Sequence, residues 1–401
     1  MGPQDLPALL AGNAEVTPAD EFERKLALGR PLRVKLGLDP GASMVTLGWA
    51  VQLRKLRQFQ DLGHQAVLIV GDFTARVGDP SGRSETRPRL SKEQVRVHAD
   101  ALLDQFWVVL DRERTEVRYN AEWLEPMDME AILGLTSSYT VARMLERDDF
   151  AKRYQQGKPI SIMEFLYPLF QGMDSVSVRA DVELGGRDQT FNLLVGRDLQ
   201  RADGQEPQVA LTTPLLVGTD GVQKMSQSVG NYIGITESPE DMFGKLARVP
   251  DELIAEYRLL ALDFFRDPPQ AERVGKGLAD GTLDPWQEKR RLAREVVDLY
   301  HGEGTGTVAE AEFDRVHRAG ELPEEIAEEA IPADLIVDGT VYVPKLVAAL
   351  GLAQSASRAR GLIEQGGVRV DGERLEDLEA SVERLRGAVL QVGRRHFVKL
   401  G

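Results

Sequence analysis

The first 235 residues alternate between short apolar runs and longer stretches in which apolar residues recur at helical spacing. The runs at 32–38, 66–70, 180–184 and 211–216 have the length and composition of buried strands. A polar loop, GLDPGASM, follows the first run, and a helix is expected from Thr46 to Leu62. Strand, loop and helix in this order open a doubly wound parallel sheet, in which ligands bind beyond the strand ends. We therefore expect an α/β domain over residues 1–235.

Three short motifs predict where helices begin. Thr17 precedes Pro18 and two acidic residues, as expected of an N-cap followed by a proline at the first helical position. Ser91 and Gln94 have the spacing of a capping box. Ser238 caps another helix, and the hydrophobic pattern changes there, which predicts a helical domain over 236–330.

The last segment, 331–401, reads as a small α+β domain. A strand at 368–370 is flanked by the glycine turns 366–367 and 371–372, and a helix is expected to begin near Ser357. Residues 341–401 contain ten Lys and Arg against seven Asp and Glu, a net charge of +3. Because the whole chain carries −15, residues 1–340 carry −18. An acidic body with a mildly basic tail permits a local RNA contact but argues against indiscriminate nucleic-acid binding.

The stretch 164–192 contains a polar helix face. Tyr167, Gln171 and Asp174 recur at spacings of four and three, so they project from one side of a helix whose early turn accommodates Pro168. A phenol, an amide and a carboxylate on an apolar helix suit a pocket for a small polar ligand. The alternative from the residues alone is a face that is simply solvated.

The longest polar loop of this half, 71–90, carries Thr74, Asp79, Arg83 and Arg87. A solvated loop is the plain interpretation of this segment. A phosphate-binding or ammonium-binding loop is the functional one, since a carboxylate that faces an ammonium in a closed pocket forms a charge-assisted pair.

Composition narrows the classes of protein. Apolar residues make up 42% of the chain and charged residues 28%, as in soluble globular proteins. The absence of cysteine excludes disulfides and thiolate metal sites, and no run approaches the length of a membrane span. We expect a cytoplasmic protein that does not bind membranes and has no metal site of its own.

The whole chain resembles the bacterial tyrosyl-tRNA synthetases. The segments that carry the resemblance are GLDPGASMVTLGW, GDPSGRSETRP, a GG-x-DQ turn, PLLVGTDGVQKMSQSVGNYI and KRRLAREVVDLYHG. The last 60 or so residues resemble the small RNA-binding module that a ribosomal protein shares with these synthetases. The resemblance implies a Rossmann-like class I synthetase core, a helical domain and a small RNA-binding domain.

The resemblance also implies roles for individual residues. Tyrosine would be bound by Lys35, Asp39, Thr74, Asp79, Tyr167, Gln171, Asp174 and Gln189. ATP, a substrate that brings Mg²⁺, would be bound by Gly37, Thr46, Gly48, Gly186, Asp188 and Lys224. The catalytic residues would be Lys224 with Arg83 and Arg87 of the basic loop. Lys35 stands where many relatives have a tyrosine that is a second partner of the substrate phenol.

Several positions depart from the family pattern. The two histidines of the HIGH motif are Thr46 and Trp49, and a threonine before them is Gly41. The second lysine of KMSKS is Gln227, and the small residue of the GG-x-DQ turn is Arg187. An indole has one donor and is far bulkier than imidazole, so we expect it to fill space that the ATP ribose needs.

Two hypotheses follow from these departures. In one, the chain is a tyrosine–tRNA ligase with an eroded ATP site, partly compensated by Arg187, Arg83 and Lys224. In the other, it is a non-catalytic paralogue that binds tyrosine or tRNA as a sensor or regulator. Another nucleotidyl transferase on the same sheet is disfavoured, because Tyr167, Gln171 and Asp174 are retained together.

The expected partners are tRNA(Tyr), tyrosine, ATP and a second copy of the chain. The tRNA would contact basic residues of the last domain, Arg358, Arg360 and Arg369 together with Arg394 and Arg395. The family's symmetric dimer, formed through the nucleotide-binding domain, is expected here too.

Overall fold

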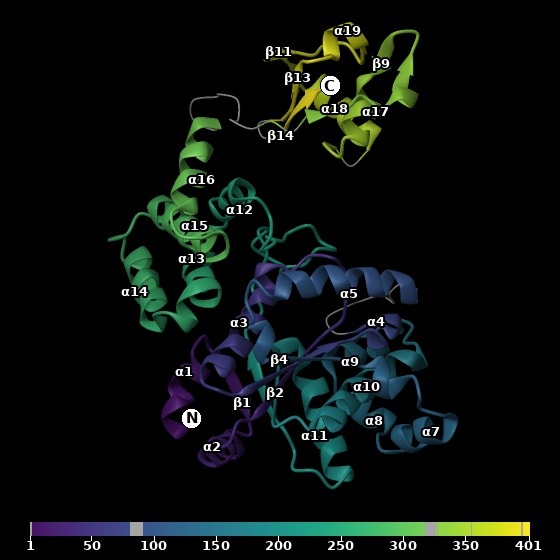
Figure 1. Cartoon of the computed structure of the whole chain (residues 1–401), viewed down its shortest axis with the longest axis vertical. Helices are drawn as coiled ribbons and strands as arrows, with labels where there is room; N and C mark the ends of the chain where they lie inside the picture. The colour runs from purple at the N-terminus through teal and green to yellow at the C-terminus, as the bar shows by residue number, and fades with distance from the viewer. Residues whose placement is uncertain (1, 81–90, 317–325, 327, 354, 394–395) are drawn as a thin grey trace. The chain divides into compact units, whose positions relative to one another are not determined.

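The computed structural model describes residues 2–80, 91–316, 326, 328–353, 355–393 and 396–401, and the chain forms two compact units, 1–306 and 307–401 (Figure 1). The sheet and the helices that follow it, as far as residue 306, belong to one unit. The separate sheet and helical domains expected from the sequence, with boundaries at 235 and 330, remain predictions.

A six-stranded sheet forms the centre of the first unit, in the order β1-β6-β5-β2-β3-β4. Strands β6, β5, β2, β3 and β4 run parallel, and β1 pairs antiparallel with β6 at one edge. Their bounds are β1 Glu15–Thr17, β2 Arg33–Leu38, β3 Gln65–Val70, β4 Thr115–Tyr119, β5 Val182–Gly186 and β6 Val209–Thr213. This is the doubly wound α/β fold predicted from the hydrophobic pattern.

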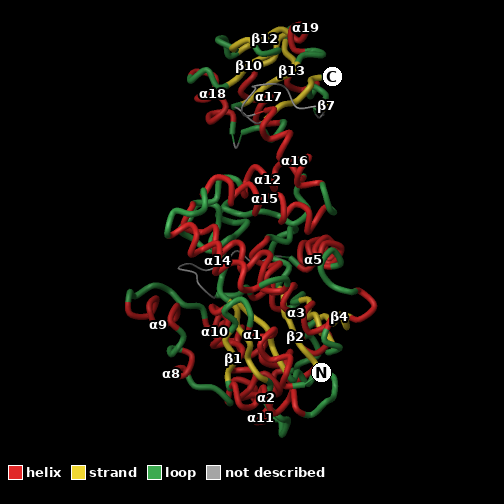
Figure 2. The backbone as a smooth tube through the Cα atoms, turned by 90° about the vertical axis from the view of Figure 1, so that its left-hand side faces the viewer, coloured by secondary structure: helices red, strands yellow, loops and turns green. Residues whose placement is uncertain are grey.

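Helices cover both faces of this sheet (Figures 1 and 2). On one face Val67 and Ile69 of β3 pack against the end of α10 at Val178. Helix α3 packs on the other face, and its buried residues include Leu53 and Leu56. The helices of this half are α1 Leu6–Leu10, α2 Ala19–Ala27, α3 Leu47–Asp61, α4 Thr74–Val77, α5 Lys92–Phe106, α6 Ala121–Leu124, α7 Met129–Ser137, α8 Val141–Met144, α9 Asp148–Gln155, α10 Ile162–Val178 and α11 Thr190–Ala202.

Two of the three predicted helix starts are confirmed. Ser91 and Gln94 form the capping box of α5, and the Ser238 side chain accepts a hydrogen bond from the third residue of the next helix. The third was wrong, because Thr17 ends β1 and Pro18 is the N-cap of α2. The expected early-turn position of Pro168 was also wrong, since α10 begins at Ile162, six residues earlier.

A helical segment completes the first unit and extends into the second. It comprises α12 Pro239–Leu246, α13 Ile254–Tyr257, α14 Pro268–Ala279, α15 Pro285–His301 and α16 Thr305–Asp314. Within the described part of the chain, no helix is long and apolar enough to cross a membrane.

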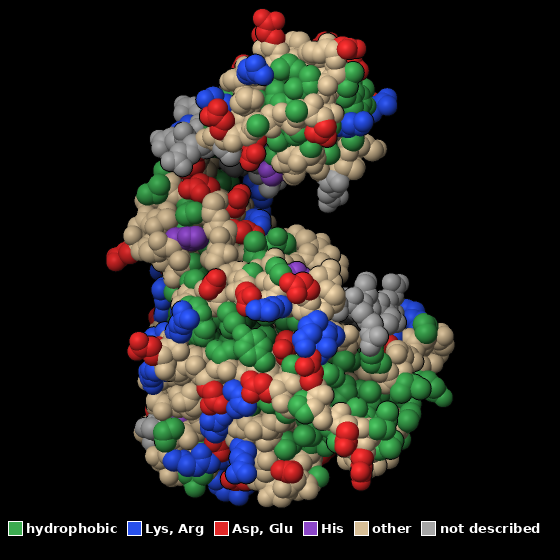
Figure 3. All heavy atoms as spheres, turned by 45° about the vertical axis from the view of Figure 1, so that its right-hand side comes forward, with side chains coloured by type: hydrophobic (Ala, Val, Ile, Leu, Met, Phe, Trp, Pro, Cys, Tyr) green, Lys and Arg blue, Asp and Glu red, His purple; other side chains and the backbone are tan. Residues whose placement is uncertain are grey.

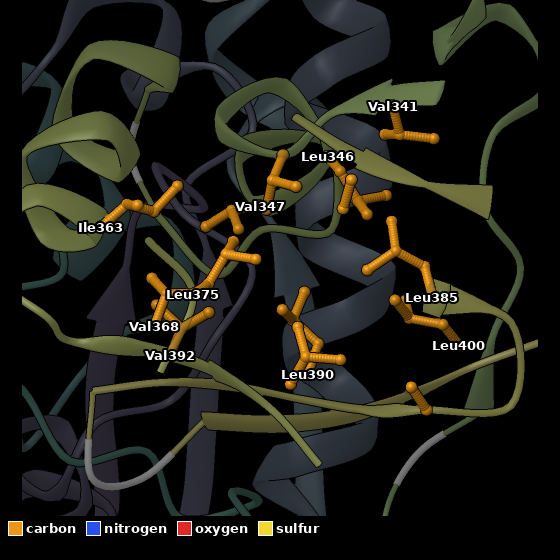
Figure 4. Packing of buried hydrophobic residues seen from close by; sticks show 14 of the residues in the cluster. Val341, Leu346, Val347, Ile363, Val368, Leu375, Leu385, Leu390, Val392 and Leu400 are labelled. Carbon is orange, nitrogen blue, oxygen red and sulfur yellow. The ribbon is translucent and has the colours of Figure 1, made fainter. Parts of the chain in front are cut away.

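The second unit is a small α+β domain, as predicted. It contains a five-stranded sheet in the order β11-β10-β13-β14-β7 and a three-stranded sheet in the order β12-β9-β8. The strands are β7 Glu328–Glu329, β8 Ile336–Val337, β9 Thr340–Tyr342, β10 Val368–Val370, β11 Glu373–Arg374, β12 Glu379–Ser381, β13 Val389–Val392 and β14 His396–Leu400. The helices are α17 Val343–Ala349, α18 Ala356–Glu364 and α19 Val382–Leu385. Leu346, Val347, Leu375 and Leu390 are fully buried between them (Figure 4), so this unit has its own hydrophobic core.

Candidate active site

Helix α10 carries the three polar residues predicted to share a face. The side chain of Ser161 accepts a hydrogen bond at the start of the helix, and the Ser161 N–H donates to Glu164 Oε1 at 2.9 Å, so this end is fixed by a capping box. Tyr167 and Asp174 are buried, with 6% and 3% of their surfaces exposed, and Gln171 is partly exposed between them. Burial of polar side chains at this spacing requires partners from other elements.

One end of the helix face contacts the loop after β2. The Tyr167 hydroxyl donates to Asp39 Oδ2 at 2.9 Å, and the Thr74 hydroxyl donates to Asp39 Oδ1 at 2.7 Å. Burial and the neighbouring carboxylate of Asp39 raise the pKa of Tyr167, so its phenol stays protonated. A Cβ atom at Gly71 would overlap Asp39 Oδ1, which explains why glycine stands beside this pair.

A second group of amides adjoins these residues. Gln189 Nε2 donates to Asp79 Oδ2 at 2.9 Å. Asn192 Nδ2 donates to Gln171 Oε1 at 3.0 Å and to Gln189 Oε1 at 2.9 Å. Asp79, Gln171 and Gln189 are therefore brought together as predicted from the resemblance, and Asn192 at the start of α11 links them.

The other end of the helix face is occupied by Asp174. Trp123 Nε1 donates to Asp174 Oδ1 at 2.9 Å, and Asn120 Nδ2 lies 3.3 Å from Oδ2. Burial raises the pKa of Asp174 to about 7, against the opposing effect of Lys35 and these two donors. Each carboxylate oxygen retains capacity to accept another hydrogen bond, so Asp174 can receive a ligand hydroxyl.

Lys35 lies beneath α10, fully buried, and its ammonium has three acceptors. Its Nζ donates to Glu183 Oε1 at 2.9 Å, to Ser175 Oγ at 2.8 Å and to the Gln171 carbonyl at 3.1 Å. An ammonium has three hydrogens, so these contacts satisfy it completely. Lys35, which the resemblance places among the tyrosine-binding residues, therefore has no N–H left to donate to a substrate in this arrangement.

The residues predicted to bind ATP lie at the ends of β2 and β5 and around the start of α3. Lys224 Nζ lies 2.6 Å from Asp188 Oδ2, so the KMSQS loop, residues 224–228, contacts the GG-x-DQ turn, residues 185–189. A Cβ at Gly186 would approach Leu215 to 2.6 Å, whereas one at Gly37 would meet nothing within 4 Å. A Cβ at Gly48 would lie 3.5 Å from Met225 Cβ, which puts this loop directly over the first turn of α3.

The positions that depart from the HIGH and KMSKS motifs have specific local contacts. Thr46 is the N-cap of α3, and its hydroxyl accepts from the Trp49 N–H at 3.4 Å. The Trp49 side chain is partly buried, and among the described residues its indole makes no hydrogen bond. Gln227 Nε2 donates to the Met44 carbonyl, so it links the KMSQS loop to the loop before α3.

Arg187 of the GG-x-DQ turn has partners outside the proposed ATP site. The Arg187 guanidinium forms an ion pair with Glu15 at 2.7 Å and donates to the Asn13 carbonyl at 3.2 Å, so it contacts the segment around β1. Compensation of the ATP site by Arg187 would require these contacts to break. Arg83 and Arg87 lie outside the described residues.

The arginines predicted to bind RNA are exposed on the second unit. Arg358 lies in the first turn of α18, which Ser355 caps. Arg360 donates to Glu364 at 2.8 Å, and Arg369 donates to the Gly372 carbonyl at 3.0 Å. Arg394 and Arg395 lie outside the described residues.

Three residues of the site were missed as ligand-pocket residues by sequence reasoning. Asn120 follows β4, Trp123 lies on α6, and Asn192 lies on α11. Only Asn192 had a signal in the sequence, because it follows Gln189 by three residues at the start of a helix. No group of three or more His, Asp or Glu side chains among the described residues could bind a metal ion.

The chain matches two known family models. Residues 27–318 match the family model described as tRNA synthetases class I (W and Y), and residues 343–384 match the S4 domain. The first match covers well over half of the chain. The chain therefore belongs to the class I tRNA synthetases of this type.

Individual relatives narrow the family further. The tyrosine–tRNA ligase of Moorella thermoacetica is 50% identical over 401 residues, which cover 99% of this chain and 95% of that protein. That of Thermotoga maritima is 47% identical over 406 residues, covering 100% and 98%. The chain is thus a member of the tyrosine–tRNA ligase family. A tyrosyl-tRNA synthetase from Archaeoglobus fulgidus, solved in complex with L-tyrosine, has the same fold, with a TM-score of 0.63 at 22% identity over 77% of this chain and 99% of that one.

Proposed function

We propose that this protein is a tyrosine–tRNA ligase whose activation step is slow. It would bind tyrosine and ATP, form tyrosyl-adenylate with release of pyrophosphate, and transfer the tyrosyl group to tRNA(Tyr). The observation that supports this proposal most strongly is the buried polar face of α10. Its residues are held by Asp39 at one end and by Trp123 and Asn120 at the other.

The proposed pocket suits the two ends of tyrosine. The substrate ammonium would lie among Asp79, Tyr167 and Gln171, where a carboxylate and two oxygen acceptors favour a cation. The substrate phenol would donate to Asp174. Phenylalanine cannot make that hydrogen bond, so it would leave a buried carboxylate without its partner, and this is costly.

Activation is attack of the tyrosine carboxylate on the α-phosphate of ATP, and no covalent enzyme intermediate is required. The protein therefore contributes positioning and stabilisation of the charge that develops on the phosphates. The start of α3 supplies the positive end of a helix dipole, and Lys224 supplies a cation. Mg²⁺ would arrive with ATP as part of the substrate.

The slow activation is inferred from the first turn of α3. A histidine at each of the two HIGH positions would supply a donor, whereas Thr46 uses its hydroxyl as an N-cap and Trp49 presents an indole. Loss of one preorganised donor typically lowers a rate by about 10²–10³-fold, and such losses are not additive.

A second candidate function is that of a tyrosine-binding or tRNA-binding regulator without catalysis. The same Trp49 favours it, because a partly buried indole in the first turn of α3 would occupy space beside the helix end proposed to bind phosphate. The ligase and a tyrosine-binding regulator both need the tyrosine pocket, and they differ only in whether the nucleotide reacts.

A second copy of the chain is proposed as a partner. Large hydrophobic side chains are exposed on α7, α8 and α9 and at the start of α10, namely Met129, Leu133, Val141, Tyr154 and Ile162 with 62–80% of their surfaces exposed. Figure 3 shows hydrophobic side chains gathered on this side of the first unit. An exposed apolar patch of this kind marks an interaction surface, and membership of a dimeric family favours a second copy as its occupant.

Sedimentation should show a dimer that Ile162→Glu and Leu133→Glu together convert to monomer. A wild type that is monomeric at every concentration would contradict the assignment.

Calorimetry and aminoacylation test the proposal together. Tyrosine should bind to the purified protein, and phenylalanine should bind far more weakly. Charging of tRNA(Tyr) should then be detectable above a no-enzyme control. Equal or absent binding of both amino acids would refute the pocket, and tyrosine binding without any charging would favour the regulator.

A further inference from the structure

The most deeply buried ion pair near the proposed pocket is formed by Lys35 of β2 and Glu183 of β5. Their side chains are 0% and 1% exposed, and Nζ lies 2.9 Å from Oε1. The two strands are neighbours in the sheet, and the parallel register pairs these two residues directly. Both side chains rise from the sheet face that α10 covers.

Such a pair is not explained by stability alone. Removing two charges from water costs several kcal/mol per ion, and well-packed apolar residues at such places are often as stable or more so. A buried pair that is retained beside a ligand pocket therefore calls for a role in that pocket.

The pair contacts the residues that bracket the pocket. Lys35 donates to the Gln171 carbonyl and to Ser175, one residue beyond Asp174. Glu183 accepts from Gln171 Nε2 at 3.1 Å, so the side-chain oxygen of Gln171, Oε1, points the other way and accepts from Asn192 Nδ2. Gln208 Nε2 also donates to Glu183 Oε2, which fixes the carboxylate.

Asp174 is surrounded by few charges. Lys35 from β2 lowers its pKa, and Glu183 from β5 raises it. From its own helix the nearest titratable group is the protonated phenol of Tyr167, and the donors from the β4–α6 region, Asn120 and Trp123, are uncharged. Burial is the largest influence on the pKa of Asp174, and Lys35 and Glu183 are the charged side chains that act on it in opposite directions.

We propose that Lys35 and Glu183 are positioning residues that set the charge state of Asp174 and thereby the strength with which the pocket accepts a phenolic hydroxyl. This inference rests on the proposed tyrosine-binding function. An ionised Asp174 accepts a charge-assisted hydrogen bond from the phenol, which is about twice as strong as a neutral one. A protonated Asp174 has a donor of its own and one less acceptor for the ligand. Lys35 favours the first state without touching the ligand.

The pH dependence of amino-acid binding tests the inference. Tyrosine affinity of the wild type should fall as the pH drops through the pKa of Asp174, which is about 7. One unit below that midpoint the loss should approach about tenfold, because protonation competes with binding. Phenylalanine, which has no hydroxyl, should show no such step.

Variants of the pair should move this midpoint in opposite directions. Lys35→Gln keeps hydrogen-bond donors but removes the charge, so the midpoint should rise and tyrosine affinity at pH 7.5 should fall several-fold. Glu183→Gln removes the like charge, so the midpoint should fall and the loss of affinity at pH 6.5 should shrink. Lys35→Met would leave Glu183 unpaired. The pH midpoint of tyrosine binding in Lys35→Met is therefore compared with that of the double variant Lys35→Met, Glu183→Gln, which lacks both charges.

Lys55 provides a matched control, because it is also a fully buried lysine but donates to the Leu9 and Ala11 carbonyls on the other side of the sheet. Lys55→Met should leave the tyrosine midpoint where it is in the wild type. If the wild type binds tyrosine but the pH midpoints of tyrosine binding are the same in Lys35→Gln and Glu183→Gln, the inference is overturned and the proposed function stands. Absence of tyrosine binding in the wild type would overturn both.

Discussion

The ammonium of Lys224 lies 2.6 Å from Oδ2 of Asp188, so an ion pair joins the KMSQS loop to the GG-x-DQ turn. The two residues are 36 positions apart, and each was predicted separately to bind ATP. Half of the lysine side chain is exposed, and exposed ion pairs contribute about 0–1 kcal/mol, so phosphate oxygens can compete for the ammonium. The ion pair thus holds the Lys224 ammonium weakly beside the proposed nucleotide site.

We predict that Lys224→Met lowers the rate of tyrosine activation by about 10²-fold, since it removes one preorganised positive charge from the developing phosphate charge. Tyrosine affinity should not change, because Lys224 contacts no residue of the tyrosine pocket in the described part of the chain. Single-turnover kinetics and calorimetry measure the two quantities. Lys276→Met, which removes an exposed lysine paired with Glu272 on α14, is the matched control. Equal rates for both variants would contradict a catalytic role for Lys224.

Lys55 gives a prediction for stability. Burial lowers its pKa from 10.5 to about 7, so between these values the unfolded chain binds more protons than the folded one. The free energy of unfolding should therefore gain a contribution that rises with pH from about 7 to 10.5, by at most about 1.4 kcal/mol per unit. Urea unfolding at pH 7, 8 and 9 should show this rise in the wild type and its loss in Lys55→Met. Parallel curves for the two proteins would contradict the shifted pKa, and Lys276→Met should retain the wild-type slope.

The exposed arginines of the second unit give a prediction for tRNA binding. Arg358→Gln, Arg360→Gln and Arg369→Gln together should weaken tRNA binding and reduce its dependence on salt, because fewer phosphate counterions would be released. Each arginine that contacts a phosphate should lower the salt slope by about one. Filter binding over a range of KCl concentrations measures the slope, and tyrosine affinity is the internal control. An unchanged salt slope in the triple variant would show that these arginines do not contact phosphates of the tRNA.

The parts of the fold that follow a local period were predictable from the sequence. Strands β2, β3, β5 and β6 of the central sheet coincide with apolar runs of the sequence, and the shared face of Tyr167, Gln171 and Asp174 follows from spacings of three and four residues. Strands β1 and β4 were not predicted. The capping box at Ser91 is equally local, because both partners lie within one turn. Pro168 misled the prediction, since a proline in the second turn of a buried helix has the same local sequence as one in the first.

The contacts between distant segments could not be predicted in this way. Asn120 and Trp123 are isolated polar and aromatic residues after an edge strand, and nothing in their spacing relates them to Asp174. The resemblance places Lys35 in the tyrosine site, and its contact with Glu183 could not be predicted, because the two residues are 148 positions apart and only the register of β2 with β5 brings them together. The family resemblance predicted that Asp39, Thr74 and Asp79 belong to the pocket. Sequence spacing alone could not predict this.

The start of α3 separates the two candidate functions. If Trp49 obstructs the nucleotide, Trp49→Ala should restore ATP affinity while the activation rate stays low, because alanine supplies no donor. If only donors are missing, ATP should bind to the wild type and to Trp49→Ala about equally. Calorimetry with ATP in the presence of tyrosine distinguishes these outcomes.

Tyrosine-dependent exchange of pyrophosphate into ATP is the measurement that tests the ligase directly. The wild type should show slow but detectable exchange. The triple variant Gly41→Thr, Thr46→His, Trp49→His should raise it by about 10²-fold or more, because two imidazole donors would again face the developing phosphate charge. No exchange in either protein, with tyrosine still bound to both, would contradict the ligase and leave a tyrosine-binding regulator as the function of this chain.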